Sequence, residues 1–248
     1  MSDGDQGHGY FQRSWAILST MGLVNFLLGF MVLGITGRCR IAAVPMVVSA
    51  AGALANGLCV VAFIDPHPFY ASMTALVFCD IFWMVEEVGL TFYGYIILRH
   101  VSLFHHNRAT IDITFWSLVL VVIALRFAIL SCDIRNFLNP SNEGLVDTVY
   151  RLQIGYFSAI ALIEGLTAAF LLKSFCTIQK GSANAGLRTS LIRHLIRSTE
   201  VRVTILCLIS ITRTITSIFL VPTLGRASFA SQFDRFVIVL EVMFPIIM

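Results

Sequence analysis

Seven runs of about 20 apolar residues follow one another along this sequence, and no other feature constrains its fold as strongly. An α-helix needs about that many apolar residues to cross roughly 30 Å of hydrocarbon. Apolar residues make up 57% of the 248 residues and charged residues 12%, a composition far from that of soluble domains. The runs predict an all-α membrane protein, a single seven-helix transmembrane domain over residues 1–248 with spans at 15–36, 41–64, 72–98, 113–132, 152–172, 203–221 and 229–248.

Basic residues predict the orientation of these spans, because Lys and Arg near span ends are retained on the cytoplasmic side. Ten of them flank the ends that follow the first, third and fifth spans, and five flank the opposite ends. We therefore expect the N-terminus outside the cell and the C-terminus in the cytosol, with the plasma membrane as the location. The sequence stops within an apolar run at Met248, which predicts that a cytosolic tail is missing.

The longest predicted inner loop carries a basic segment, residues 188–202, with the sequence RTSLIRHLIRSTEVR. Its apolar residues fall on one helical face, while Arg193 and Arg197 lie off that face. One interpretation is a cytosolic extension of the sixth span whose arginines meet anionic lipid headgroups. The other is a docking surface for a cytosolic signalling protein. In both interpretations the contacts are expected from Arg188, Arg193, Arg197 and Arg202.

Nine amide, carboxyl or guanidinium side chains lie deep within the predicted spans. A charged side chain that faces lipid near the bilayer centre costs about 2.5–3.5 kcal/mol, so these residues are expected to face the interior of the helix bundle. Rows of small residues favour close helix packing in the second span, at Ser49, Ala53 and Gly57, and in the fifth span, at Ala161, Gly165 and Ala169. The nine residues are Asn25, Asn56, Asp80, Glu86, Glu87, Arg126, Glu164, Arg213 and Glu241.

The third predicted span carries three of the five acids in this group. Asp80 and Glu87 are seven residues apart and share a helix face, whereas Glu86 must meet a different neighbour. We expect Asp80 to reach Arg126 or Arg213. Five acids against two arginines leave a formal charge of −3, so one or more acids is predicted to be protonated or to meet a cation. The group could hold helices together, line a ligand pocket in the outer half, or form a path for protons or ions.

Some kinds of chemistry do not fit this sequence. A retinal protein needs a lysine within the membrane, but Lys173 and Lys180 lie at the cytosolic end of the fifth span and in the loop after it. All six histidines lie in tails or loops, so no zinc site is expected. We expect no cofactor, metal, nucleic-acid partner or enzymatic activity. Cys79 and Cys132 are the cysteines nearest the outer face and form the candidate disulfide.

Two stretches near the C-terminus resemble known proteins. They are RSTEVRVTILCLISITRTITSIF at 197–219 and SQFDRFVIVLEVMFPIIM at 231–248. Over about its last third the chain resembles a group of uncharacterised seven-span integral membrane proteins of filamentous fungi. That resemblance implies a fold and a membrane location but no mechanism. The last span is also similar to lipid-translocating exporters, in the order of Asp234, Phe236, Glu241, Met243 and Pro245.

The leading functional hypothesis is a divergent receptor-like sensor in the lipid bilayer. A small-molecule ligand would bind in the outer half, near Asp80, Glu87, Arg126 and Arg213, and would shift the positions of the helices. The basic segment would then report the change to a cytosolic signalling protein. One alternative is a proton-coupled transporter or lipid exporter that uses the glutamates of the third, fifth and seventh spans. Another is a structural scaffold whose buried charges fix the register of the helices.

Overall fold

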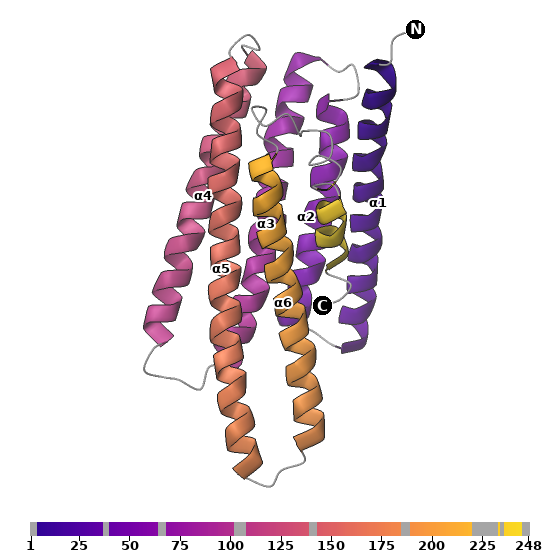
Figure 1. Cartoon of the computed structure of the whole chain (residues 1–248). Coiled ribbons are helices and arrows are strands. Elements are labelled where there is room, and N and C mark those ends of the chain that lie inside the picture. The colour runs from indigo at the N-terminus through magenta and orange to yellow at the C-terminus, as the bar shows by residue number, and fades with distance from the viewer. Residues whose placement is uncertain are drawn as a thin grey trace. The chain divides into compact units, whose positions relative to one another are not determined.

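The computed structural model describes residues 4–36, 40–63, 68–101, 108–138, 143–184, 189–219, 233 and 236–244, and this part of the chain is helical almost throughout. Six long helices follow in order, with a short seventh helix over residues 236–244 (Figure 1). The long helices are α1 (Gly4–Thr36), α2 (Arg40–Phe63), α3 (Phe69–Val101), α4 (Arg108–Leu138), α5 (Glu143–Asn184) and α6 (Thr189–Phe219).

Five of the long helices contain stretches that are long and apolar enough to cross a membrane. These stretches are Trp15–Ile35, Ala43–Phe63, Ala109–Leu138, Gly144–Cys176 and Val201–Phe219. They confirm the expected multi-pass helical membrane protein. The helix α3 covers the whole of the third predicted span, 72–98, but its crossing of the bilayer, the span at 229–248 and the orientation stay predictions.

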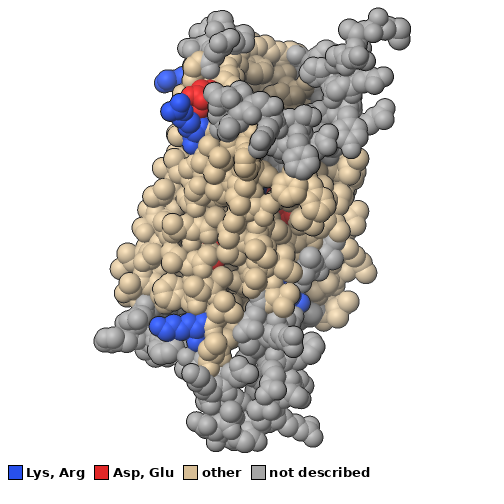
Figure 2. Space-filling view, viewed as in Figure 1, with Lys and Arg blue, Asp and Glu red and all other residues tan. Residues whose placement is uncertain are grey.

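Large apolar side chains lie exposed along the candidate spans, as expected of helices that face lipid. On α1, Leu27, Phe30 and Met31 are 55%, 62% and 64% exposed. In the space-filling view the described surface is mostly uncharged, with few blue or red side chains visible (Figure 2). Monomeric soluble proteins rarely expose so wide an apolar surface to water. The exposed surface therefore agrees with the apolar composition of the sequence.

The chain divides into two compact units. Unit 1 comprises Met1–Leu90, Phe127–Val149 and Ile238–Met248, and unit 2 comprises Thr91–Arg126 and Tyr150–Val237. Among the described helices, α3, α4, α5 and the short helix over residues 236–244 each contain a boundary between the units.

In unit 1, small residues bring α1 and α2 side by side (Figure 1). A methyl group added to Gly22 would lie 2.9 Å from the backbone nitrogen of Ala53, and the Ser19 hydroxyl donates a 2.8 Å hydrogen bond to the Ala53 carbonyl. Gly57 lies against the same hydroxyl. Close backbone approach of this kind needs small residues, so the predicted packing role of the small-residue row on the second span is confirmed for Ala53 and Gly57.

In unit 2, a hydrophobic cluster joins α3, α5 and α6 through Leu98, Ala168, Leu171, Phe175 and Val203. Aromatic rings join α3 to α4, because the ring of Tyr95 stacks on that of Phe115 with 4.0 Å between centroids. These contacts place the cytosol-proximal part of α3, in the predicted orientation, inside a packed core.

Helices extend beyond several of the predicted spans. The helix α4 continues to Leu138 and α5 begins at Glu143, whereas the predicted spans end at residue 132 and begin at residue 152. The physical reason is that an apolar run marks only the part of a helix that meets lipid, while its polar ends continue into water. The helix α6 begins at Thr189, so the basic segment from that residue onward is continuous with the sixth span, as one interpretation expected. Arg188 lies outside the described residues.

Candidate functional site

The structure buries eight of the nine polar residues predicted within the spans, and the ninth, Arg213, is half-buried. Each side chain thus lies away from the exposed apolar surface. Unit 1 holds Asn25, Asn56, Asp80, Glu86, Glu87 and Glu241, and unit 2 holds Arg126, Glu164 and Arg213. The expected pairing of Asp80 with Arg126 or Arg213 joins residues of different units and stays a prediction.

Glu86 and Asn56 meet at Gly52, in the interior of unit 1. The carboxyl group of Glu86, on α3, lies so close to Gly52, on α2, that a methyl group added there would overlap it. The Asn56 amide donates a 2.8 Å hydrogen bond to the Gly52 carbonyl. The absence of a side chain at Gly52 therefore creates the space that the buried carboxyl group occupies. Glu86 was expected to meet a different neighbour from Asp80 and Glu87, and Gly52 is that neighbour.

Asn25 joins α1 to the short helix over residues 236–244. Its side-chain amide donates a 2.6 Å hydrogen bond to the backbone carbonyl of Val242, and both residues are buried. Glu241, next in sequence to that carbonyl, is also buried. A buried amide that bonds to a backbone carbonyl across 217 positions of sequence is a tertiary contact between helices.

A cavity of about 590 Å³ opens in unit 1 beside Asp80. That volume falls in the range of small-molecule sites, about 300–1,000 Å³. The helices α1, α2, α3 and α4 all contribute to its wall. The wall combines three polar side chains with four aromatic ones, and it consists of Trp15, Phe63, Leu76, Cys79, Asp80, Trp83, Leu130, Asp133, Asn136 and Phe137.

Asp133 and Asn136 also line this cavity. The predicted fourth span ended at residue 132, so both residues were expected in the loop after it. They lie on the last turns of α4, which continues to Leu138. With Leu130 and Phe137 they follow the spacing of one helix face, which is the signal that could have found them. Asp133 and Asn136 therefore belong with Asp80 in the candidate site.

The two arginines of unit 2 lie over aromatic rings on α5. The guanidinium carbon of Arg126 is 5.2 Å from the ring centroid of Tyr156, and that of Arg213 is 4.3 Å from the ring centroid of Phe157. Cation–π contacts of this kind stabilise a guanidinium group that is withdrawn from water. Acids were the only partners predicted for these arginines, and the two aromatic rings were not predicted.

Glu164 meets Ser210 within unit 2. The Ser210 hydroxyl, on α6, donates a hydrogen bond to a carboxylate oxygen of Glu164, on α5, and both side chains are buried. Nearby, Gly165 lies against Cys207 of α6. Glu164 is therefore an interhelical hydrogen-bond acceptor, which is one of the roles expected for the buried acids.

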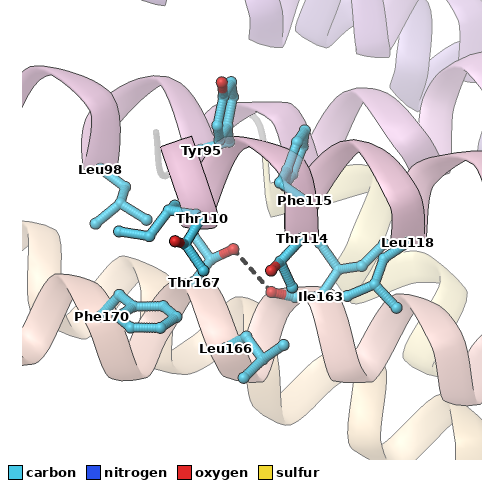
Figure 3. Close-up of a pocket in the computed structure, with 11 residues that line it drawn as sticks. Tyr95, Leu98, Thr110, Thr114, Phe115, Leu118, Ile163, Leu166, Thr167 and Phe170 are labelled. Carbon is cyan, nitrogen blue, oxygen red and sulfur yellow. Dashed lines mark hydrogen bonds between the residues drawn. The ribbon is translucent and has the colours of Figure 1, made fainter. Parts of the chain in front are cut away.

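A second, smaller pocket lies in unit 2 among α3, α4 and α5 (Figure 3). Its volume is about 130 Å³, and its wall is mainly apolar. The hydroxyl of Thr167 bonds back to the Ile163 carbonyl at 2.7 Å, and the Tyr95 hydroxyl donates to Asp112 at 2.8 Å. With the hydroxyls of Thr167 and Tyr95 already bonded within the protein and little room inside, this pocket suits an organic ligand less well than the cavity of unit 1 does.

The expected disulfide between Cys79 and Cys132 is not formed in the structure, where both are free cysteines. The sulfur atom of Cys79 instead lies 2.7 Å from that of Cys59, because α2 and α3 bring these two side chains together. Both of these cysteines are buried. Depth along α3 identified Cys79 but could not show which neighbouring helix it faces. Cys59 lies only five residues before the predicted outer end of the span at 41–64, so the expectation that Cys79 and Cys132 are the cysteines nearest the outer face overlooked it.

The contacts expected from the basic segment lie partly outside the described residues. The backbone at Arg193 and Arg197 is helical, and their side chains lie outside the described residues. Arg202 is half-buried on α6. Within the described part of the chain, no group of three or more His, Cys, Asp or Glu residues could hold a metal ion.

The fold and its buried polar residues define the class of this protein, a multi-pass α-helical membrane protein. No protein-family model, curated protein or solved structure matches the chain. The comparisons therefore assign the chain to no family within this class.

Proposed function

We propose that this protein is a non-enzymatic, receptor-like sensor that binds a small molecule in the cavity of unit 1. The cavity carries the proposal, because its volume suits an organic ligand and its wall includes Asp80, which was expected in a ligand pocket. In the predicted orientation, with the N-terminus outside, this part of α3 belongs to the outer half of the membrane. A ligand would then arrive from outside the cell.

The wall of the cavity favours a small organic cation as the ligand. Asp80 and Asp133 supply carboxylates, and Asn136 supplies an amide. Each carboxylate also interacts within the protein. The aromatic rings of Trp15 and Trp83 complete the wall, and indole faces attract cations, including quaternary ammonium groups. An amine with an apolar substituent matches all of these groups.

The signal would leave the membrane through the basic segment of α6. A ligand that binds one arrangement of the helices more tightly than another shifts the population toward that arrangement. The helix α6 is continuous from its described start at Thr189 to Phe219, so its displacement would move the basic segment. A cytosolic signalling protein would read that displacement at Arg193, Arg197 and Arg202. A location in the plasma membrane is part of the same proposal.

A second candidate is a proton-coupled transporter or lipid exporter. The burial of Glu87, Glu164 and Glu241 favours it, since buried acids within membranes mark proton paths in transporters. The contact between Glu164 and Ser210 and the bond from Asn25 to Val242 favour a third candidate, a scaffold in which polar groups join helices. Proton-coupled flux in vesicles that contain the purified protein would support the transporter.

Binding of a quaternary ammonium compound to the purified full chain in nanodiscs tests the proposed function. Tetraethylammonium is compared with a neutral alkane of the same shape, and the readout is the fluorescence of the tryptophans, two of which line the cavity. The Asp80→Asn variant keeps the side-chain shape and removes the charge. Tetraethylammonium has no N–H group, so the variant loses only a charge–charge attraction, about 3 kcal/mol for unit charges roughly 6 Å apart at an effective dielectric constant of about 20. Binding should therefore weaken roughly 100-fold.

The control variant is Asp147→Asn, which removes a carboxylate of unit 1 that does not line the cavity. It should bind the cation as the unaltered chain does. Equal binding of the cation and the neutral compound, or unchanged binding by Asp80→Asn, would refute the cation site. The signalling step is tested separately: ligand-stimulated nucleotide exchange on a guanine-nucleotide-binding protein should be lost when Arg193 and Arg197 are both replaced by Ala.

A further inference from the structure

The thiols of Cys59 and Cys79 form a pair that the proposed function does not use. Cys59 lies on α2 and Cys79 on α3, 20 positions apart in sequence. Their sulfur atoms are 2.7 Å apart, and the side chains are 0% and 1% exposed. A disulfide bond has a length of about 2.0 Å and needs its two Cα atoms held at a suitable separation by the backbone. Here two packed helices already hold the sulfurs close to bonding distance.

We propose that Cys59 and Cys79 are a dithiol site that a small disulfide compound oxidises to an intramolecular disulfide between α2 and α3. The inference depends on the packing of these two helices and on access through the cavity of unit 1, and it does not require that the cavity bind a signalling ligand. It also replaces the Cys79–Cys132 bridge expected from depth alone. In the predicted orientation the pair lies near the outer ends of both helices, on the side where oxidising conditions prevail.

The cavity of unit 1 determines which thiol reacts first. Cys79 lines the cavity, whereas Cys59 is fully buried and is absent from its wall. A small disulfide that enters the cavity therefore meets Cys79. The Cys79 thiol loses a proton, and its thiolate attacks one sulfur of the compound, releasing one thiolate and leaving a mixed disulfide on Cys79.

The second step closes the bridge. Cys59 loses its proton and attacks the Cys79 sulfur of the mixed disulfide, which releases the other half of the compound. In total the two protein thiols give up two electrons and two protons, and the small disulfide becomes two thiols. The short distance between the sulfurs favours this closure over attack on the mixed disulfide by a thiol from solution.

Peptide mapping of the unaltered full chain tests the proposal without any variant. The purified protein is treated with oxidised glutathione, its remaining thiols are alkylated after denaturation, and the chain is cleaved with chymotrypsin, for which Phe63 and Tyr70 are sites between the two cysteines. We expect the peptides of Cys59 and Cys79 to be joined and to separate on reduction. Alkylation of both cysteines in the oxidised sample, or a bridge from Cys79 to Cys132, would overturn the proposal.

Single variants test the order of the two steps. In Cys59→Ser, Cys79 should carry glutathione as a stable mixed disulfide, because its resolving thiol is gone. In Cys79→Ser, Cys59 should stay unmodified and be alkylated only after denaturation. The matched control Cys132→Ser should form the bridge as the unaltered chain does. If Cys59 took up glutathione in Cys79→Ser while Cys79 took up none in Cys59→Ser, the assigned order of attack would be wrong.

Discussion

Replacement of Gly52 by Ala tests the buried contact between α2 and α3. The added methyl group would lie 2.7 Å from the carboxyl carbon of Glu86 and 2.9 Å from one of its oxygens. Non-bonded carbon atoms prefer about 3.5–4.0 Å, so the carboxyl group would have to retreat by about 1 Å. Glu86 is buried, and so little free space is available for that movement. Overpacking of this kind costs about 1–3 kcal/mol.

Gly34→Ala is the matched control, since a methyl group at Gly34, on the exposed face of α1, meets no atom within 4 Å. Both substitutions gain helix propensity of up to about 1 kcal/mol, which cancels in the comparison. We therefore expect Gly52→Ala to be less stable than Gly34→Ala by about 1–3 kcal/mol, a factor of roughly 5 to 150 in the ratio of folded to unfolded protein.

The assay is unfolding of the purified variants in mixed micelles as the fraction of dodecyl sulfate rises, followed by circular dichroism and tryptophan fluorescence. Glu86→Ala provides a second background. Removal of the carboxyl group should abolish most of the extra cost of Gly52→Ala, because no group remains for the methyl group to overlap. Equal stability of the two Gly→Ala variants, or the same cost of Gly52→Ala in both backgrounds, would refute the described position of Glu86.

Two interhelical hydrogen bonds give further predictions. Asn25→Ala removes the bond to Val242 and should destabilise the protein by about 0.6–1.7 kcal/mol in the same unfolding assay, whereas Thr20→Ala, which loses only a bond within α1, should have a smaller effect. For Glu164 and Ser210, a double-mutant cycle with Glu164→Ala and Ser210→Ala should give a coupling of about 1 kcal/mol; additive effects would contradict the bond between them.

The helices could be predicted well from the sequence because helix residues that contact lipid are apolar, so each span appears as an apolar run. The run at 41–64 corresponds to α2 at Arg40–Phe63 within one residue at each end. The run at 152–172 corresponds to only half of α5, Glu143–Asn184, because a helix that leaves the membrane keeps its hydrogen bonds while its residues become polar. Span prediction therefore finds the helix but underestimates its length.

The burial of polar residues was also predictable, since the cost of facing lipid applies to each of them. Their individual partners were not. Glu86 contacts Gly52, which has no side chain, and Arg126 lies over the ring of Tyr156. Because Gly52 and Tyr156 are uncharged, a search for ion pairs would not find these partners. Cys79 likewise meets Cys59 because of the rotation of α2 about its axis, which apolar composition alone does not specify.

The central claim is that α3 crosses the bilayer with its three carboxyl groups turned away from lipid. Single cysteines at His67, before α3, and at Asn107, after it, in a background without the native cysteines, can be labelled with a membrane-impermeant maleimide on intact cells. We predict that the cysteine at position 67 is labelled from outside and that the cysteine at position 107 reacts only after permeabilisation. Labelling of both positions from the same side would contradict the account.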